Sequence, residues 1–249
     1  MEKFIGIIPA RYASSRFPGK PLAKIGEMTM IERVWRQARK ALDHAVVATD
    51  DSRIYDAVKA FGGDVVMTGE HHRSGTDRCY EAYCNIGSDA NVIINIQGDE
   101  PFIHPDQIEE IKQCFADPET QIATLVRRFD PSKGFKALAD NTKPKVVFDN
   151  RGFALYFSRS VIPFVRGAET ADWANRHTYY QHVGMYAYRA ETLKEITRLP
   201  QSSLELTESL EQLRWLENGY KIKVGITEHE TIGIDTPEDL AKALTLLND

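Results

Sequence analysis

The sequence predicts an α/β fold in which a mixed, mainly parallel β-sheet lies between layers of helices. Three observations support this prediction. Short runs rich in valine and isoleucine recur through the first half of the chain, stretches with helical spacing separate them, and the runs near residues 145 and 155 have no such stretch between them. Strands that are apolar throughout are typical of parallel sheets, because helices cover both faces. The alternation therefore indicates βαβ units and a Rossmann-like three-layer sandwich.

The first half of the chain contains five expected strands, which we predict to be buried on both faces. They are Phe4–Pro9, Ala45–Thr49, Asp64–Met67, Asn91–Ile96 and Gln121–Val126. The stretches between them have the spacing of amphipathic helices. These expected helices are Met30–Leu42, Ser52–Phe61, Asp77–Cys84 and Pro105–Phe115.

A different arrangement is expected after about residue 130, where the alternation weakens. Because no helix separates the first two later strands, this region is expected to be partly antiparallel. The later elements are strands Lys145–Phe148, Phe153–Phe157 and Val183–Tyr188, helix Leu204–Glu217, strand Lys221–Ile226 and a terminal helix after Thr236-Pro237. There is no repeat or linker, so residues 1–249 are expected to form one domain with a lobe inserted at approximately 130–190.

Composition and charge exclude several classes of protein. The 249 residues carry a formal net charge of −5, and no Lys/Arg run is longer than Arg127-Arg128, so nucleic acid and membrane surfaces are not expected partners. The apolar start is too short for an export signal, and no later run reaches the roughly 18 residues of a membrane span. Three cysteines without CxxC spacing indicate neither a disulfide framework nor a structural zinc site. We therefore expect a soluble, cytoplasmic protein.

The loop after the first expected strand concentrates positive charge. Arg11, Arg16 and Lys20 lie there with Gly19, which lets backbone amides approach a ligand. Ligands of open parallel sheets bind beyond the carboxyl ends of the strands, and these cations suit the spread charge of a triphosphate. A solvated loop with surface salt bridges is the alternative. Neither GxxxxGK followed by Ser or Thr nor GxGxxG occurs, which excludes the P-loop proteins and the NAD-dependent dehydrogenases.

Two acidic residues follow later strands at positions suited to a metal ion. Asp99 comes soon after the apolar run that ends at Ile96, and Asp235 follows another expected strand. Mg²⁺ prefers one or two carboxylates together with phosphate oxygens and water, and triphosphates normally react as magnesium complexes. A turn before Pro101 is the structural alternative for Asp99. Around Asp235 the alternative is a helix start capped by Thr236.

The segment Ser74–Arg78 offers hydroxyls, a glycine and a guanidinium where a loop meets an expected helix. These groups suit a nucleobase or a phosphate, although a helix capped by Ser74 or Thr76 accounts for the same residues. His71 and His72 precede the segment. Adjacent histidines lack the i, i+4 spacing of a helical zinc site and no HExxH occurs, so we expect no histidine metal centre.

Polar residues in the later apolar segments could bind the carboxylate and hydroxyls of a sugar. Arg159 lies near the end of an expected strand, and His182 and Tyr186 share one face of another. A histidine satisfied by its structural neighbours is the alternative for His182. Glu211 lies on an expected helix, where a solvated surface position is the alternative.

Seven segments resemble, in order, the motifs of the CMP-Kdo synthetases (3-deoxy-manno-octulosonate cytidylyltransferases). They are PARYASSRFPGKPL, HHRSGTDR, NIQGDEP, YFSR, HVGMYAY, LELTESLEQLRWLENG and GIDTPEDL, and they extend over essentially the whole chain. The first motif is shared in outline with the CMP-sialic acid synthetases, but FPGKPL and QGDEP favour the Kdo branch. The resemblance implies a nucleotidyltransferase sandwich with an inserted dimerisation and sugar-binding lobe. It also implies a homodimer that joins CTP to Kdo, giving CMP-Kdo and pyrophosphate for lipopolysaccharide biosynthesis.

The resemblance also implies roles for individual residues. The catalytic residues would be Lys20, Asp99 and Asp235, of which the two acids would hold Mg²⁺. The residues implied to bind the nucleotide are Ala10, Arg11, Arg16, Lys20, Ser74 and Arg78. Those implied to bind the sugar are Gln97, Arg159, His182, Tyr186 and Glu211.

Two other functions are compatible with the sequence. A related sugar nucleotidyltransferase, of the CMP-sialic acid, 8-amino-Kdo or UDP/GDP-sugar type, would use the same phosphate loop. A non-catalytic nucleotide-binding regulator could share the fold, since a fold does not fix chemistry. The presence of Lys20 together with Asp99 and Asp235 argues against the regulator, because a sensor needs no catalytic metal pair. No dedicated general base is visible.

Overall fold

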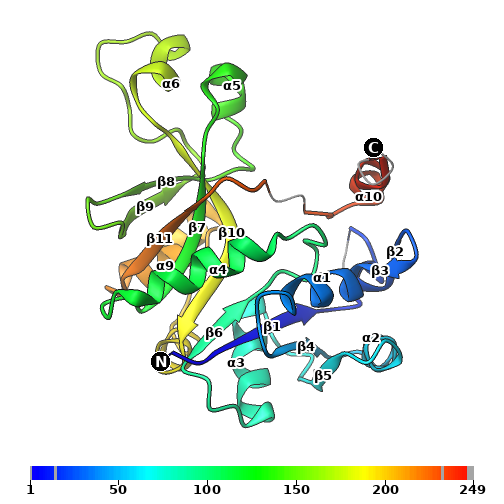
Figure 1. Ribbon diagram of the computed structural model, residues 1–249. Coiled ribbons are helices and arrows are strands. Elements are labelled where there is room, and N and C mark those ends of the chain that lie inside the picture. Colours follow the sequence, from blue (N-terminus) through cyan, green and yellow to red (C-terminus); the bar gives the residue numbers. More distant parts are fainter. Residues whose placement is uncertain (1, 14–15, 231–232, 246–249) are drawn as a thin grey trace. The chain divides into compact units, whose positions relative to one another are not determined.

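The computed structural model describes residues 2–13, 16–230 and 233–245, and they form two compact units. Unit 1 comprises residues 1–109, 185–197 and 231–249, and unit 2 comprises residues 110–184 and 198–230. Unit 2 thus extends on both sides of the lobe expected at residues 130–190. Figure 1 shows the elements of each unit in the colours of the sequence.

Unit 1 is built on a mainly parallel sheet. Its strands are β1 (Phe4–Ala10), β4 (Ala45–Thr49), β5 (Asp64–Met67), β6 (Val92–Asn95) and the second half of β10 (Tyr180–Arg189). They lie in the order β10-β6-β1-β4-β5, in which only the β10–β6 pair is antiparallel. A short hairpin of β2 (Lys24–Ile25) and β3 (Met28–Thr29) stands apart from this sheet. The mixed, mainly parallel sheet that the sequence predicts is confirmed.

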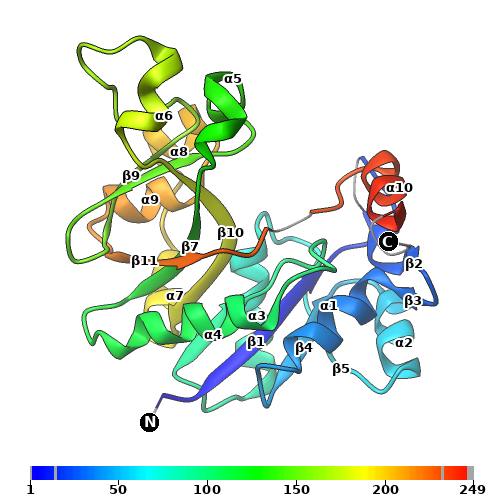
Figure 2. The same ribbon diagram turned by 45° about the horizontal axis from the view of Figure 1, so that its top comes forward.

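Three helices connect the parallel strands of unit 1, namely α1 (Met30–Ala38), α2 (Ser52–Ala60) and α3 (Gly75–Ile86). Helix α7 (Ala190–Ile196) follows β10, α10 (Pro237–Thr245) is the last described helix of the chain, and a 3₁₀ turn, η1, lies at Lys20–Leu22. Right-handed crossovers place α1 and α3 on opposite sides of β1, because the connection through α3 runs back across the sheet. Figure 2 shows this arrangement. All carboxyl ends of the parallel strands therefore meet at one edge.

One burial prediction for unit 1 is wrong. We expected the strand at Asp64–Met67 to be buried on both faces, yet none of its four residues is buried and Met67 is 42% exposed. The reason is its place in the sheet. β5 is the edge strand beyond β4, so only one side of its backbone is paired.

Unit 2 combines parallel and antiparallel strands. Strand β7 (Ile122–Arg128) pairs in parallel with β11 (Ile222–Thr227), and β8 (Lys145–Phe148) pairs antiparallel with β9 (Ala154–Ser158). Its helical segments are η2 (Cys114–Ala116), η3 (Pro131–Lys133), α5 (Gly134–Leu138), η4 (Thr170–Asp172), α6 (Trp173–Arg176), α8 (Ser203–Glu208) and α9 (Gln212–Glu217). Helix α4 (Pro105–Gln113) spans the boundary at residue 110. The partly antiparallel region expected after residue 130 is confirmed.

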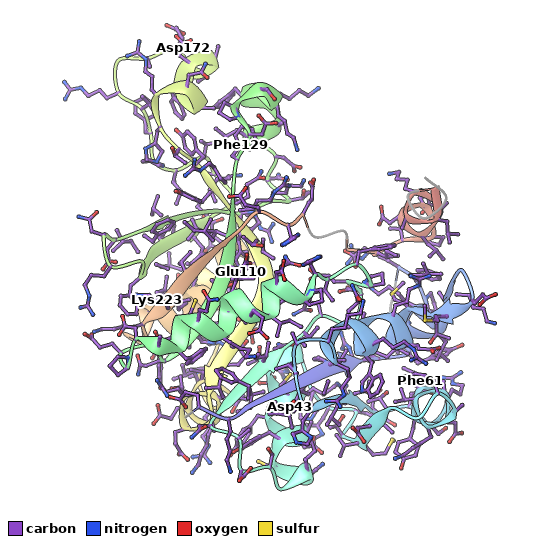
Figure 3. The ribbon with its side chains drawn as sticks, viewed as in Figure 1. Asp43, Phe61, Glu110, Phe129, Asp172 and Lys223 are labelled. Carbon is purple, nitrogen blue, oxygen red and sulfur yellow. The ribbon has the colours of Figure 1, made fainter. Side chains whose placement is uncertain are left out.

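The aromatic residues of unit 2 form a small core of their own. Phe129, Leu138, Trp173 and Tyr179 are buried against one another where α5 and α6 meet. Figure 3 shows Phe129 beneath these helices and Asp172, the residue before α6, at the top of the view. These four residues lie between the end of β7 and the start of β10, so the cluster packs the helical part of this connection together.

The helix expected at Leu204–Glu217 is interrupted. Ser209 adopts a left-handed conformation with φ of 51°, which ends α8, and α9 begins only at Gln212. In an unbroken helix Leu206, Leu210 and Leu213 would share one face, but Leu206 lies on the separate first helix and is 61% exposed, whereas Leu210 and Leu213 are buried. In the described part of the chain, no helix is both long and apolar enough to cross a membrane.

Candidate active site

A pocket of about 410 Å³ lies in unit 1 beyond the carboxyl ends of β1 and β6. This volume falls in the range of small-molecule sites. The predicted residues among those lining it are Ala10, Arg11, Arg16, Lys20, Ser74, Arg78, Gln97, Asp99 and Asp235. The structure therefore brings together, in one cavity, every nucleotide-binding and metal-binding residue that the sequence suggests.

The loop after β1 is closed by its own backbone. The Gly19 amide donates to the Tyr12 carbonyl over 2.9 Å, and the Lys20 amide donates to the Phe17 carbonyl over 3.1 Å. Gly19 has φ of 71°, a conformation that glycine adopts without steric cost. This turn starts η1, whose second residue is Pro21, and fixes the position of Lys20 at the wall of the pocket.

Lys20 joins the two predicted acids. Its ammonium donates to Asp99 over 2.7 Å and to Asp235 over 3.1 Å, and only 13% of the Lys20 side chain is exposed. The guanidinium of Arg16 lies 3.2 Å from the same Asp235 oxygen. The Ile234 amide donates to the Asp99 carbonyl over 2.9 Å, which ties the two acidic segments together. Two carboxylates and two cations thus face one another in the pocket.

Glu100, the acid next to Asp99, is not among the residues that line the pocket. Burial, and secondarily the charge of Asp99, raise the pKa of Glu100 to about 8. A carboxyl group with this pKa is largely protonated at neutral pH. Asp99 is therefore the residue of this pair that presents negative charge to the pocket.

The structure confirms the helix-capping alternatives for the segment around Asp235 and for the segment Ser74–Arg78. Thr236 caps α10, because its hydroxyl accepts from the Asp239 amide over 3.2 Å, and the Asp239 carboxylate accepts in return from the Thr236 amide. Ser74, not Thr76, caps α3 by accepting from the Asp77 amide over 3.1 Å. Ser74 therefore caps α3 and also lines the pocket.

Arg78 is anchored within the pocket wall. Its guanidinium donates to the Asp50 carboxylate over 2.6 Å, to the Thr68 hydroxyl over 2.6 Å and to the Gly69 carbonyl over 3.3 Å, and only 1% of its side chain is exposed. Sequence reasoning missed Asp50. Its position directly after the strand Ala45–Thr49 is the signal that could have found it, because that strand ends at the same edge of the sheet.

Gly98 is required by a close approach of two backbones. A Cβ atom at this position would lie 2.6 Å from the Pro9 carbonyl oxygen. Such a distance forces the backbone to move, since no side chain can yield.

We expect Gly98→Ala to lower the free energy of unfolding by about 1–3 kcal/mol, the usual cost of overpacking. Urea unfolding of the variant and the wild type measures this. Gly184→Ala is the matched control, because a Cβ there meets nothing within 4 Å. Equal losses in the two variants would show that the contact with Pro9 is not the cause.

Three of the five residues expected to bind the sugar belong to unit 2, namely Arg159, His182 and Glu211. The Arg159 guanidinium donates to the main-chain carbonyls of Glu208, Asn141 and Ser209 over 2.6, 2.9 and 3.2 Å. Carbonyls are neutral acceptors, so these bonds orient the guanidinium without cancelling its charge.

The remaining sugar-site predictions have different surroundings. Glu211 is half-buried and accepts from Arg214 over 2.8 Å, and the buried Arg214 also pairs with the buried Glu205 over 3.3 Å. Tyr186 is buried in the part of β10 that belongs to unit 1. Gln97 lines the pocket itself.

His182 is held neutral by its surroundings in unit 2. Burial lowers its pKa to about 4, its Nε2 atom lies 3.0 Å from the Thr124 hydroxyl, and the Phe157 ring packs edge-on against it at 5.3 Å between centroids. An uncharged imidazole can exchange hydrogen bonds with a sugar hydroxyl but offers no ionic attraction to a carboxylate.

This low pKa predicts a pH dependence of stability. Between pH 4 and 6.5 the unfolded chain binds a proton at His182 that the folded chain does not, so stability should be complete above about pH 6.5 and fall toward pH 4. His182→Gln should remove part of this fall. Urea unfolding at pH 7.0 and 5.0 measures it, and an unchanged difference between the two pH values in the variant would contradict the assignment.

Comparison with known proteins identifies the family. The model of the family described as "Cytidylyltransferase" matches residues 5–222, which is most of the chain. The chain belongs to the cytidylyltransferase family.

Individual relatives of this cytidylyltransferase are similar over their full length. The 3-deoxy-manno-octulosonate cytidylyltransferase of Parabacteroides distasonis is 66% identical over 248 residues, which is 99% of each chain. That of Phocaeicola vulgatus is 65% identical over 98% of this chain and 97% of its own. A solved structure of CMP:2-keto-3-deoxy-manno-octonic acid synthetase complexed with CTP matches with a TM-score of 0.90, 41% identity and 99% coverage of both chains. The predicted nucleotidyltransferase fold is confirmed.

The acidic residues of this cytidylyltransferase fit a magnesium ion. Carboxylate oxygens of Asp99 and Asp235 converge on the single ammonium of Lys20, so both can also face one bound cation. Mg²⁺ is bound in proteins by one or two such carboxylates, with substrate phosphates and water completing its coordination.

Proposed function

We propose that this cytidylyltransferase transfers CMP from CTP to the anomeric hydroxyl of Kdo, giving CMP-Kdo and pyrophosphate. The observation that carries the proposal is the pocket of unit 1, where Lys20 lies between Asp99 and Asp235 with Arg11 and Arg16 beside it. Full-length relatives at 64–66% identity bear the name of this activity, which supports the choice of sugar.

CTP would occupy the pocket with its phosphates at the cationic loop. Arg11 and Arg16 offer guanidinium groups and Lys20 an ammonium, which together match the distributed charge of a triphosphate. The cytidine would lie near Ala10, Ser74 and Arg78, whose side chains or backbone line the same cavity. Because Asp50 and Thr68 fix the guanidinium of Arg78, that wall is formed before the nucleotide binds.

Catalysis would rest on positioning and on neutralisation of phosphate charge. The sugar hydroxyl attacks the α-phosphorus, the bond to the bridging oxygen breaks, and pyrophosphate leaves roughly in line, so no covalent enzyme intermediate is required. Lys20 would offset the negative charge that develops on the α-phosphate. Mg²⁺ bound by Asp99 and Asp235 would lower the pKa of the attacking hydroxyl and neutralise phosphate charge.

The sugar carboxylate would pair with Arg159 of unit 2, and His182 and Glu211 of the same unit would meet sugar hydroxyls. A planar guanidinium binds a carboxylate through two parallel charge-assisted hydrogen bonds. The three carbonyls around Arg159 leave its positive charge available for this pairing. Neutral sugars should therefore be poor acceptors.

Arg159→Ala is expected to raise the KM for Kdo at least about thirtyfold, in line with the roughly 2–5 kcal/mol cost of losing such a pair, while the KM for CTP changes little. The variant also loses three hydrogen bonds to main-chain carbonyls, so its melting temperature should be measured on the same preparation. A lower melting temperature with an unchanged KM for Kdo would assign Arg159 a purely structural role.

Pyrophosphate release with a panel of substrates tests the proposed function. We expect release to require CTP rather than UTP or GTP, and to be fastest with Kdo among Kdo, 8-amino-Kdo, sialic acid and neutral hexoses. Preference for 8-amino-Kdo or sialic acid would establish the related nucleotidyltransferase instead. Binding of CTP with no release for any acceptor would favour the non-catalytic regulator.

We further propose that the enzyme is a magnesium-dependent, cytoplasmic homodimer that supplies CMP-Kdo for lipopolysaccharide biosynthesis. Free cysteines at Cys79, Cys84 and Cys114 suit a reducing compartment. Apolar side chains exposed on unit 2, at Leu155 and Phe164, suit coverage by a second subunit. Mass measurement in solution tests the dimer.

A further inference from the structure

Three potential metal ligands meet beside α3, away from the acids of the pocket. One ring nitrogen each from His71 and His72 and one carboxylate oxygen from Glu81 all lie within 4.8 Å of one another. The two histidines are on the loop before α3 and Glu81 is in its second turn. The sequence spacing gave no reason to expect a histidine metal centre, because Glu81 lies on α3 and only the folded chain brings it to the two histidines.

His71 turns toward this cluster, although its side chain is exposed. A Cβ atom at Gly69 would lie 2.5 Å from the Nδ1 and Cε1 atoms of His71 and 3.5 Å from a carboxylate oxygen of Glu81. The imidazole therefore lies across Gly69, where only glycine leaves room for it. The His71 and His72 rings are 4.4 Å apart between centroids.

Glu81 is prepared as an anionic ligand. Both of its oxygens accept from the Gly69 amide at 3.1 Å, and His72 contacts one of them. Burial tends to raise the pKa of Glu81, but the hydrogen bonds from His72 and Gly69 outweigh it and hold the pKa below its ordinary value. Asn85 contacts the other oxygen at 3.4 Å, so a metal bond to Glu81 would take the acceptor position that His72 occupies here.

We propose that His71, His72 and Glu81 bind one Zn²⁺ ion. Two imidazoles and a carboxylate form a recognised zinc ligand set, with bonds of about 2.0–2.2 Å that place the ligand atoms roughly 3.4 Å apart. To reach this spacing the exposed His71 side chain must rotate, and the direct contact between His72 and Glu81 must open to admit the metal ion. Water would complete the tetrahedron on the exposed side. Mg²⁺ is not expected there, because it favours oxygen ligands.

The proposed zinc site is joined to the pocket through one residue. The Gly69 amide donates to Glu81, and the Gly69 carbonyl accepts from Arg78, which lines the pocket. A metal ion on Glu81 would therefore fix the segment that holds Arg78. Zinc should accordingly stabilise unit 1 around α3 as well as bind to it.

Zinc titration against a chromophoric chelator at pH 7.5, without nucleotide, tests the site. We expect one Zn²⁺ per wild-type chain, a higher melting temperature with zinc, and a loss of zinc affinity of at least about tenfold in His71→Ala. Because His71 is exposed, this variant should fold normally and have the melting temperature of the wild type when zinc is absent. Glu81→Gln should lose affinity similarly.

Two matched variants separate this site from other zinc ligands. Cys84→Ser removes the exposed thiol, and His104→Ala removes a histidine that pairs with Asp106 elsewhere. Neither should change the affinity. Zinc binding that survives in His71→Ala and Glu81→Gln, or that is lost in Cys84→Ser, would overturn the proposal, as would the absence of any stoichiometric binding to the wild type.

Discussion

Asp99→Asn and Asp235→Asn are each expected to lower kcat at least about a thousandfold at saturating CTP, Kdo and Mg²⁺. The change removes one negative charge but keeps the size of the side chain, so its effect reports the charge. In each variant only one of the two carboxylates that fit a magnesium ion remains. Initial rates of pyrophosphate release over a range of Mg²⁺ concentrations provide the measurement.

The thermal stability of these two variants is the control. Asp99 and Asp235 are 33% and 46% exposed and their ionic partner Lys20 is shared, so the melting temperatures should change by only a few degrees. A variant with near-normal kcat at saturating Mg²⁺ would show that its acid is not a metal ligand.

Lys20→Ala is expected to lower kcat at least about a hundredfold, the scale of losing one group that stabilises the transition state. The Lys20 side chain is only 13% exposed, and its ammonium lies between two carboxylates. The KM for Kdo should change little. Steady-state kinetics with each substrate varied separately measures both quantities.

Lys20→Arg tests whether position or charge alone matters. The charge is retained, but a guanidinium is larger and planar, so only partial recovery is expected. Full recovery would show that any cation suffices. An effect of Lys20→Ala confined to the KM for Kdo would place Lys20 outside the phosphate site.

Local pattern predicted much of the fold because most elements have clear boundaries in sequence. The strands Ala45–Thr49 and Lys145–Phe148 begin and end where the pattern indicates. What the pattern lacks is position in the sheet, so the exposure of β5 at the edge could not be deduced from its apolar residues. The break at Ser209 was also hidden, because serine rarely adopts positive φ.

The residues that line the pocket were easier to predict than the residues that hold them in place. Arg16, Lys20 and Asp99 follow strands whose carboxyl ends share one edge, so their convergence follows from topology. Asp50 lies at the same edge, but its importance depends on Arg78 reaching it from another element. Glu81 meets His72 for a similar reason, since a loop folds back on a helix there.

The most direct test of the central claim is ³¹P NMR of the purified enzyme with CTP, Kdo and Mg²⁺. Attack on the α-phosphorus predicts equal amounts of pyrophosphate and a phosphodiester signal, with no CDP. The signals should depend on Kdo and be absent in the Asp99→Asn variant over the same time. Formation of CDP with a phosphorylated sugar would mean attack on the γ-phosphorus, and unchanged CTP would mean no transfer; either result would contradict CMP transfer by this pocket.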